Sequence, residues 1–211
     1  MTEHPRPPVR AITLGVAEAH PLSGATLERA AAALKQATAG FTGAGWQVQT
    51  GRLSTRPLLA DLRDWPVPAV AAYAAELGQT LDQLGVEFCS VGTTFPGDGP
   101  ERAEAMADVV AGRPAINGSV LVATAQAGLD VPAAGAAARV MLRLAHETDQ
   151  GLGNFNFAAL ACVGPGTPFF PAAYHAGPAS LSVALQGAGI VADALRGGAP
   201  LEEVTARVAG A

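Results

Sequence analysis

His175 is the residue of this sequence best suited to moving a proton. It follows the turn GPGTPFFP (Gly164–Pro171), which comes directly after an apolar, strand-like run, Asn154–Val163. Histidine is the usual acid or base of enzymes near neutral pH, and it is also often a structural hydrogen-bond donor. The sequence leaves both roles open for His175.

Two arginines at the end of another strand-like run could hold an anion. Arg52 and Arg56 lie four residues apart in the segment GRLSTRPL. If the strand continues through both, their side chains share one face and could clamp a carboxylate or a phosphate. The alternative is that they form ion pairs on the surface.

Further polar groups follow other strand-like runs. Thr93 and Thr94 open the stretch TTFPGDGP, and Thr167 lies in the turn before His175. These threonines would orient a substrate. His20 could also touch a ligand, or it could be a solvent-facing loop residue next to Pro21. The predicted catalytic residue is His175, and the predicted substrate-binding residues are Arg52, Arg56, Thr93, Thr94, Thr167 and His20.

No standard cofactor or metal motif accompanies these residues. The sequence has no Walker phosphate loop, no G-x-G-x-x-G between a strand and a helix, no G-x-S-x-G elbow and no H-E-x-x-H. Cys89 and Cys162 lie on apolar runs without metal-ligand spacing, and we interpret both as reduced core residues. The sequence therefore predicts no metal site and leaves the cofactor unknown.

The composition is that of a globular protein with a large core. Of the 211 residues, 49% are hydrophobic and 15% are charged. A net charge of −5 argues against nucleic acid and against an anionic membrane as partners. The N-terminus has no apolar segment typical of a signal peptide, and no apolar run reaches the roughly 20 residues that span a bilayer. We therefore expect a cytoplasmic protein.

Strands alternating with helices are predicted to position the candidate residues. The five strand-like runs begin roughly 30 to 40 residues apart, which is the length of a βα unit. They are Val9–Val16, Trp46–Thr55, Val86–Phe95, Ile116–Ala125 and Asn154–Val163. Caps and apolar spacing predict helices from Ser23 to Gly40, Val67 to Leu84, Asp98 to Val110, Pro132 to Leu144 and Ala179 to Leu195, with a short one after Pro200.

This alternation predicts an α/β fold of five parallel βα units. The strands are nearly all apolar, which is typical of a sheet with helices on both faces. Ligands of such folds bind at the C-terminal ends of the strands, where the candidate residues fall. Residues 1–8 are expected to form a flexible proline-rich arm, and residues 9–211 a single domain.

Four segments and their order carry a resemblance to a known family. They are VRAITLGV (Val9–Val16), GRLSTRPL (Gly51–Leu58), LGVEFCSVG (Leu84–Gly92) and INGSVLVATAQAGLD (Ile116–Asp130). They resemble the uncharacterised family filed as domain of unknown function number 711. The closing PFFPAAYH, which ends at His175, strengthens the resemblance, and the whole covers about residues 9 to 195.

The resemblance implies a fold but no reaction. Members look like the ten-stranded β/α barrel of pyruvate formate-lyase, without its radical chemistry. Five βα units would be half of such a barrel, here its N-terminal half. His175 matches the family histidine. However, Gly166 and Thr167 replace an Asp-Asn pair that relatives often carry, and Gln186 stands where another branch has a Glu. These changes put a metal site or a His–Glu acid–base pair in doubt.

Two functions fit these observations. In the first, the chain is an enzyme for a small anionic metabolite, which Arg52 or Arg56 holds while His175 transfers a proton. In the second, it is a non-catalytic small-molecule-binding or scaffold module, and the missing acids favour this reading. In both, the open edges of a half-barrel need cover from a second copy or a second half-barrel chain, so we expect an oligomer.

Overall fold

The computed structural model describes residues 7–195 and 200–209, which form a mixed α/β fold. Within this part of the chain there is one sheet of seven strands. Five of them pair in parallel and in chain order, namely β1 (Val9–Gly15), β2 (Gly51–Ser54), β3 (Phe88–Thr94), β4 (Ile116–Thr124) and β6 (Phe157–Ala161). Each lies inside a predicted strand-like run and is shorter than that run.

Two further strands pair in the antiparallel direction. The short β5 (Gly128–Leu129) pairs with β4, and β7 (Ser180–Leu185) pairs with β1 at the edge of the sheet. The prediction of a helix from Ala179 was therefore wrong for β7. Its leucines fit a helical spacing, but they also alternate with serines, and pairing with β1 satisfies the backbone groups of both strands. Gln186, expected in that helix, instead follows β7, and its N–H donates to the carbonyl of Pro8.

Most predicted helices are present. The long ones are α1 (Gly24–Gly43), α3 (Val67–Gln83) and α6 (Val131–Glu147). Ser23 caps α1 as predicted, because its hydroxyl accepts the N–H of Thr26. The predicted third helix is divided into α4 (Pro100–Glu104) and α5 (Met106–Val110). The remaining helices are α2 (Leu58–Asp61), the 3-10 helix η1 (Asp149–Asn156), α7 (Ala188–Leu195) and α8 (Leu201–Ala209).

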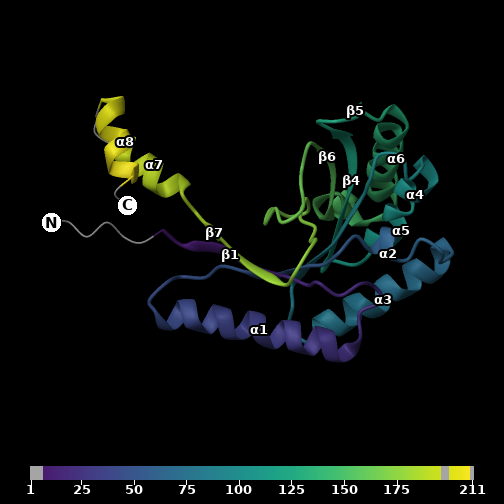
Figure 1. Cartoon of the computed structure of the whole chain (residues 1–211), viewed down its shortest axis with the longest axis horizontal. Helices are drawn as coiled ribbons and strands as arrows, with labels where there is room; N and C mark the ends of the chain where they lie inside the picture. The colour runs from purple at the N-terminus through teal and green to yellow at the C-terminus, as the bar shows by residue number, and fades with distance from the viewer. Residues whose placement is uncertain (1–6, 196–199, 210–211) are drawn as a thin grey trace.

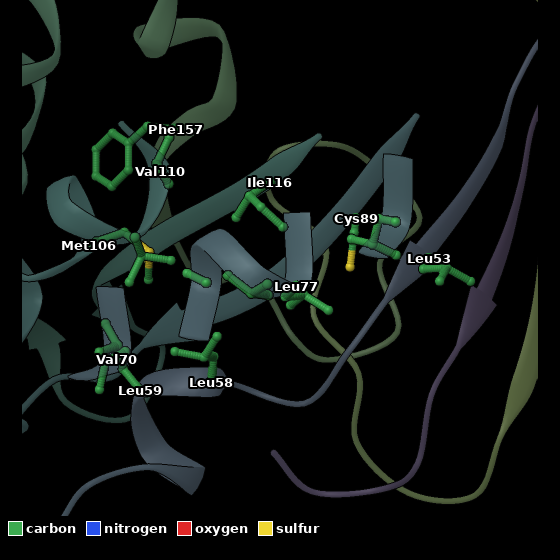
Figure 2. Close-up of a cluster of buried hydrophobic side chains, with 14 of the residues drawn as sticks. Leu53, Leu58, Leu59, Val70, Leu77, Cys89, Met106, Val110, Ile116 and Phe157 are labelled. Atoms are coloured by element: carbon green, nitrogen blue, oxygen red, sulfur yellow. The ribbon is translucent and has the colours of Figure 1, made fainter. Parts of the chain in front are cut away.

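One face of the sheet carries the hydrophobic core. Leu53, Cys89 and Ile116 of the strands are fully buried against apolar side chains of the helices (Figure 2). Gly118 belongs to the same face, where an added methyl group would lie 2.3 Å from the sulfur of Met106. Burial of this apolar area is the main favourable term in the stability of the fold.

The other face of the sheet is polar. Buried polar side chains from four neighbouring strands lie on it, among them Thr13, Ser54, Ser90, Asn117 and Ser119. The expectation of helices on both faces is therefore wrong. Residues 163–179, which we call the strap, cross this face between β6 and β7, on the side away from α1 and α3 (Figure 1).

The ends of the described chain lie near the open edge of the sheet. Beyond β7, helices α7 and α8 pack on each other and project away from the rest of the molecule (Figure 1). The expected N-terminal arm falls mostly outside the described residues. In the described part of the chain, no helix is both long enough and apolar enough to cross a bilayer.

Candidate functional site

The strap holds His175 directly against the polar face of the sheet. The side chain is 4% exposed, and its backbone N–H donates to the carbonyl of Thr55, 2.9 Å away, just after β2. Its Nε2 lies 3.0 Å from the carbonyl oxygen of Pro178. Because a carbonyl can only accept, Nε2 carries a proton, while Nδ1 has no hydrogen-bond partner among the described residues.

Gly15 of β1 makes this position of the imidazole possible. A methyl group at Gly15 would lie 2.2 Å from Nδ1 of His175 and 2.5 Å from Cε1. No real contact is this short, so the ring can rest on β1 only because residue 15 has no side chain.

Further contacts tie the strap to the sheet. The hydroxyl of Ser90 donates to the carbonyl of Ala173, within the buried face. Tyr174 donates to the carbonyl of Val163, 2.9 Å away, which closes the strap on itself. The ring of Phe170 lies 5.0 Å from the guanidinium carbon of Arg52, a cation–π distance. The strap is thus anchored at several points along the sheet.

A small cavity remains between the strap and the edge strands. It is lined by Thr13, Gly15, Ser54, Gly166, Thr167, Pro168, His175, Ser180 and Ser182. Its free volume of ≈ 10 Å³ is close to the space that one ordered water needs. These lining residues include five hydroxyl groups and one imidazole, and none of them is a carboxylate.

Two of these hydroxyl groups are buried without a hydrogen-bond partner. Thr13 and Ser54 are each 4% exposed, and their side-chain oxygens find no partner among the described residues. Leaving a buried hydroxyl unpaired costs about 1–3 kcal/mol, so such groups are rare unless something else binds them. The cavity therefore has unused hydrogen-bonding capacity next to His175.

Arg52 lies beside the cavity on the same face. It is two residues before Ser54 on β2, and its guanidinium is held between the rings of Phe88 and Phe170. Its Nε donates to the hydroxyl of Thr50, 3.1 Å away. Partial burial, and then the charge of Arg10, lower the pKa of Arg52 from its ordinary value. No carboxylate partner of Arg52 occurs among the described residues, which leaves its charge available to an anion.

His20 is part of a separate, fully satisfied network. Its Nε2 lies 2.8 Å from the hydroxyl of Thr55, which itself donates to backbone carbonyls. Its Nδ1 lies 2.8 Å from the hydroxyl of Tyr73, which accepts the N–H of Leu22. With Tyr73 donating to Nδ1 and Thr55 accepting from Nε2, these contacts fit a neutral ring protonated on Nε2. Burial lowers the pKa of His20 to about 4, against the opposing effect of Asp61. The interpretation of His20 as a solvent-facing residue is wrong.

Arg56 forms the ion pair that the sequence left open as an alternative. Its guanidinium binds the carboxylate of Asp61, with a shortest distance of 2.7 Å. Asp61 also accepts the backbone N–H of His20. Arg56 and His20 therefore share a partner at the ends of β1 and β2, and neither lines the cavity.

The two threonines at the end of β3 are buried but do not line the cavity. Thr93 donates to the carbonyl of Thr94, and the hydroxyl of Thr94 has no partner in the described part of the chain. Of the predicted residues, the structure brings together His175 and Thr167, with Arg52 adjacent. Cys89 is a core residue as predicted, and burial raises the pKa of its thiol to about 12. The prediction was wrong for Cys162, which is exposed.

Sequence reasoning missed the hydroxyl groups beneath the strap, namely Thr13, Ser54, Ser180 and Ser182. One signal could have found two of them, because Thr13 lies between two apolar residues and Ser54 follows Arg52 at an alternate position, as expected for a polar sheet face. Ser180 and Ser182 were hidden by the wrong assignment of β7 as a helix. Among the residues described, no group of three His, Cys, Asp or Glu side chains is placed to hold a metal ion.

The fold and the site define an α/β protein whose mixed sheet carries a covered, hydroxyl-lined cavity on its polar face. The chain belongs to the family described as Uncharacterised ACR (DUF711), whose model matches residues 1–209. The family resemblance expected from the sequence is thereby confirmed. No match was found among curated proteins.

We predict that Gly15→Ala displaces the His175 ring, because the new methyl group would overlap it. The imidazole resonances of His175 should shift in NMR spectra, and protease cleavage within the strap should become faster. Gly40→Ala on α1 is the matched control, since its added methyl group meets nothing within 4 Å. A folded Gly15→Ala protein with unchanged His175 resonances would contradict this account of the contact.

We also predict that His20 makes the fold sensitive to acid. Its folded pKa of about 4 lies below its ordinary value of 6.5, so the unfolded chain takes up the proton first as the pH falls. The stability contributed by the neutral ring is complete above pH 6.5 and is lost between pH 6.5 and 4. Between pH 8 and pH 5 the loss is about 2 kcal/mol.

Urea unfolding at several pH values measures this effect. His20→Gln should lack this part of the pH dependence, although it will be less stable at every pH. His146→Gln, which replaces an exposed histidine of α6, should behave like the wild type. An unchanged pH dependence in His20→Gln would show that another group is responsible.

Proposed function

We propose that this protein is an enzyme that binds a small anionic metabolite under the strap, with His175 as the acid or base. The observation that carries the proposal is the pair of buried, unpartnered hydroxyl groups of Thr13 and Ser54 in a cavity lined by His175. Buried polar groups are normally paired, so these two point to a bound molecule as their partner. Hydroxyl groups without neighbouring carboxylates favour a ligand with negatively charged oxygens.

Each group at the site has a role in this proposal. Arg52 supplies the positive charge that attracts the anion. The free lone pair on Nδ1 of His175 can accept a proton, and the bond from Nε2 to Pro178 keeps the ring in the tautomer that this requires. Thr167 lies on the strap side of the cavity, where its hydroxyl can orient the ligand.

A metabolite larger than a water molecule requires the strap to shift. Residues 164–171 of the strap are rich in glycine and proline and are exposed or half-buried, so a displacement limited to them breaks few interactions, while Ala173, Tyr174 and His175 stay buried on the sheet. Closure of the strap over a bound molecule would exclude water and strengthen electrostatic interactions at His175.

The substrate-binding roles of Arg56, His20, Thr93 and Thr94 stay predictions. The contacts of Arg56 and His20 favour a supporting role, because both brace Thr55 and Asp61 at the strand ends. Thr55 in turn accepts the backbone N–H of His175. These residues would act on the site through the position of His175.

Calorimetric titration with a panel of small carboxylates and phosphates tests the proposal. We expect Ser54→Ala and Arg52→Met to weaken binding of the best ligand by about tenfold or more, since each removes a group that contacts it. His175→Gln should bind but lack turnover. Ser119→Ala is the control, because it removes another buried hydroxyl of the polar face, one that does not line the cavity. The proposal fails if no anion binds, or if Ser54→Ala binds like the wild type.

A second candidate function is that of an assembly module, and the edge strand β7 favours it. Leu181, Val183 and Leu185 share the face of β7 that lies on the helix side of the sheet, yet each is at least 38% exposed. Five parallel strands in chain order, with helices on one face, also support half of a β/α barrel of the pyruvate formate-lyase type. A second copy or a second half-barrel chain would then cover this edge.

Sedimentation velocity separates the two candidates. If β7 is an assembly edge, the chain should sediment as a dimer or larger oligomer, and Val183→Lys should dissociate it. Leu142→Lys, which changes an exposed leucine of α6, should leave the assembly intact. A monomer at all concentrations would rule out self-assembly through β7.

A further inference from the structure

The polar side chains of the site form two rows across three paired strands. In the first row, Thr13 of β1 is paired with Arg52 of β2 on one side and with Ser182 of β7 on the other. In the second row, Gly15 is paired in the same way with Ser54 and Ser180. Residues paired in this register point to the same face, so both rows lie under the strap.

The two rows differ in charge. The first contains the guanidinium of Arg52, with Arg10 near enough to act on it. The second contains hydroxyl groups and, above Gly15, the imidazole of His175. Neither row contains a carboxylate. The first row therefore suits an anionic group, and the second suits an uncharged or anionic oxygen that can exchange a proton with His175.

The distance between the rows is set by the strands. Thr13 and Gly15 are two residues apart on β1, as are Arg52 and Ser54 on β2, and this corresponds to about 6.6 Å along the strand. A molecule that contacts both rows needs binding groups about four or five bonds apart. A single small anion would reach only one row.

We propose that the substrate is a short bifunctional acid that spans both rows. Its carboxylate or phosphate binds Arg52 and Thr13, and a second oxygen-bearing group at the other end binds Ser54 next to His175. This inference rests on the proposed function and narrows it to a class of ligand and an orientation. The reacting end is the one farther from Arg52.

The strap covers both rows at once. Phe170 lies on Arg52 in the first row, and His175 lies on Gly15 in the second. The ligand therefore displaces part of the strap from both rows. The contacts between the ligand and the rows replace the contacts between the strap and the rows. If a molecule reached only one row, the second row would stay under the strap. The buried hydroxyl of this second row would then remain without a hydrogen-bond partner.

A series of dicarboxylates of increasing length tests the two-row arrangement by calorimetry. The probes are malonate, succinate, glutarate and adipate, with butyrate and inorganic phosphate as ligands for one row. Affinity should peak at glutarate or adipate and exceed that of butyrate by at least about tenfold. Arg52→Met should weaken all the probes. Ser54→Ala should weaken the long dicarboxylates and leave butyrate unchanged, while Ser119→Ala, outside the cavity, should change none.

The outcomes separate this inference from the proposed function. If butyrate or phosphate binds as tightly as every dicarboxylate, or if Ser54→Ala weakens all probes equally, the two-row inference is overturned and anion binding stands. If no probe binds to the wild-type protein, both are overturned. Thermal unfolding monitors the fold of each variant. If Ser54→Ala does not fold, Ser180→Ala removes an exposed hydroxyl of the same row and should show the same dependence on ligand length.

Discussion

The parallel register of the strands is the constraint on which the site depends. Because β1, β2, β3 and β4 pair in register, residues of one kind align across them, with Leu14, Leu53 and Cys89 on the helix side and Ser54, Ser90 and Asn117 on the other. A slip of one residue would turn every polar side chain into the core. Burial of the apolar side chains in the core therefore favours this register, and the register determines where the hydroxyl groups of the site lie.

A polar sheet face removed from water needs hydrogen-bond partners, and the strap supplies some of them. Ser90 reaches the carbonyl of Ala173, and the carbonyl of Thr55 accepts the N–H of His175. The strap does not satisfy Thr13 or Ser54, which lie at the cavity. The hydroxyl of Thr94 and Nε of Arg113 also lack partners among the described residues, but Thr13 and Ser54 share a cavity with a histidine, which makes them the best indication of function.

The two buried histidines show how the surroundings of a side chain decide whether it has a structural role or is available for proton transfer. Both are attached to Thr55, His20 through its side chain and His175 through its backbone. His20 has partners at both ring nitrogens, and burial holds it neutral. Among the described residues, the ring of His175 has a hydrogen-bond partner at Nε2 and none at Nδ1, and His175 lines the cavity. The same residue type is therefore a structural element in one position and a candidate for proton transfer in the other.

Local patterns in the sequence determined the five parallel strands, the long helices and the family, because apolar periodicity and capping residues act over a few neighbouring positions. They also indicated His175, since the strand and turn before it place it at a strand end. Contacts between distant segments were decided only by the tertiary structure. Ser180–Leu185 forms a strand because it pairs with the otherwise unpaired edge of β1. Arg56 forms an ion pair with Asp61 and does not line the cavity. Thr13, Ser54 and His175 are remote in sequence, and only the register and the strap bring them together.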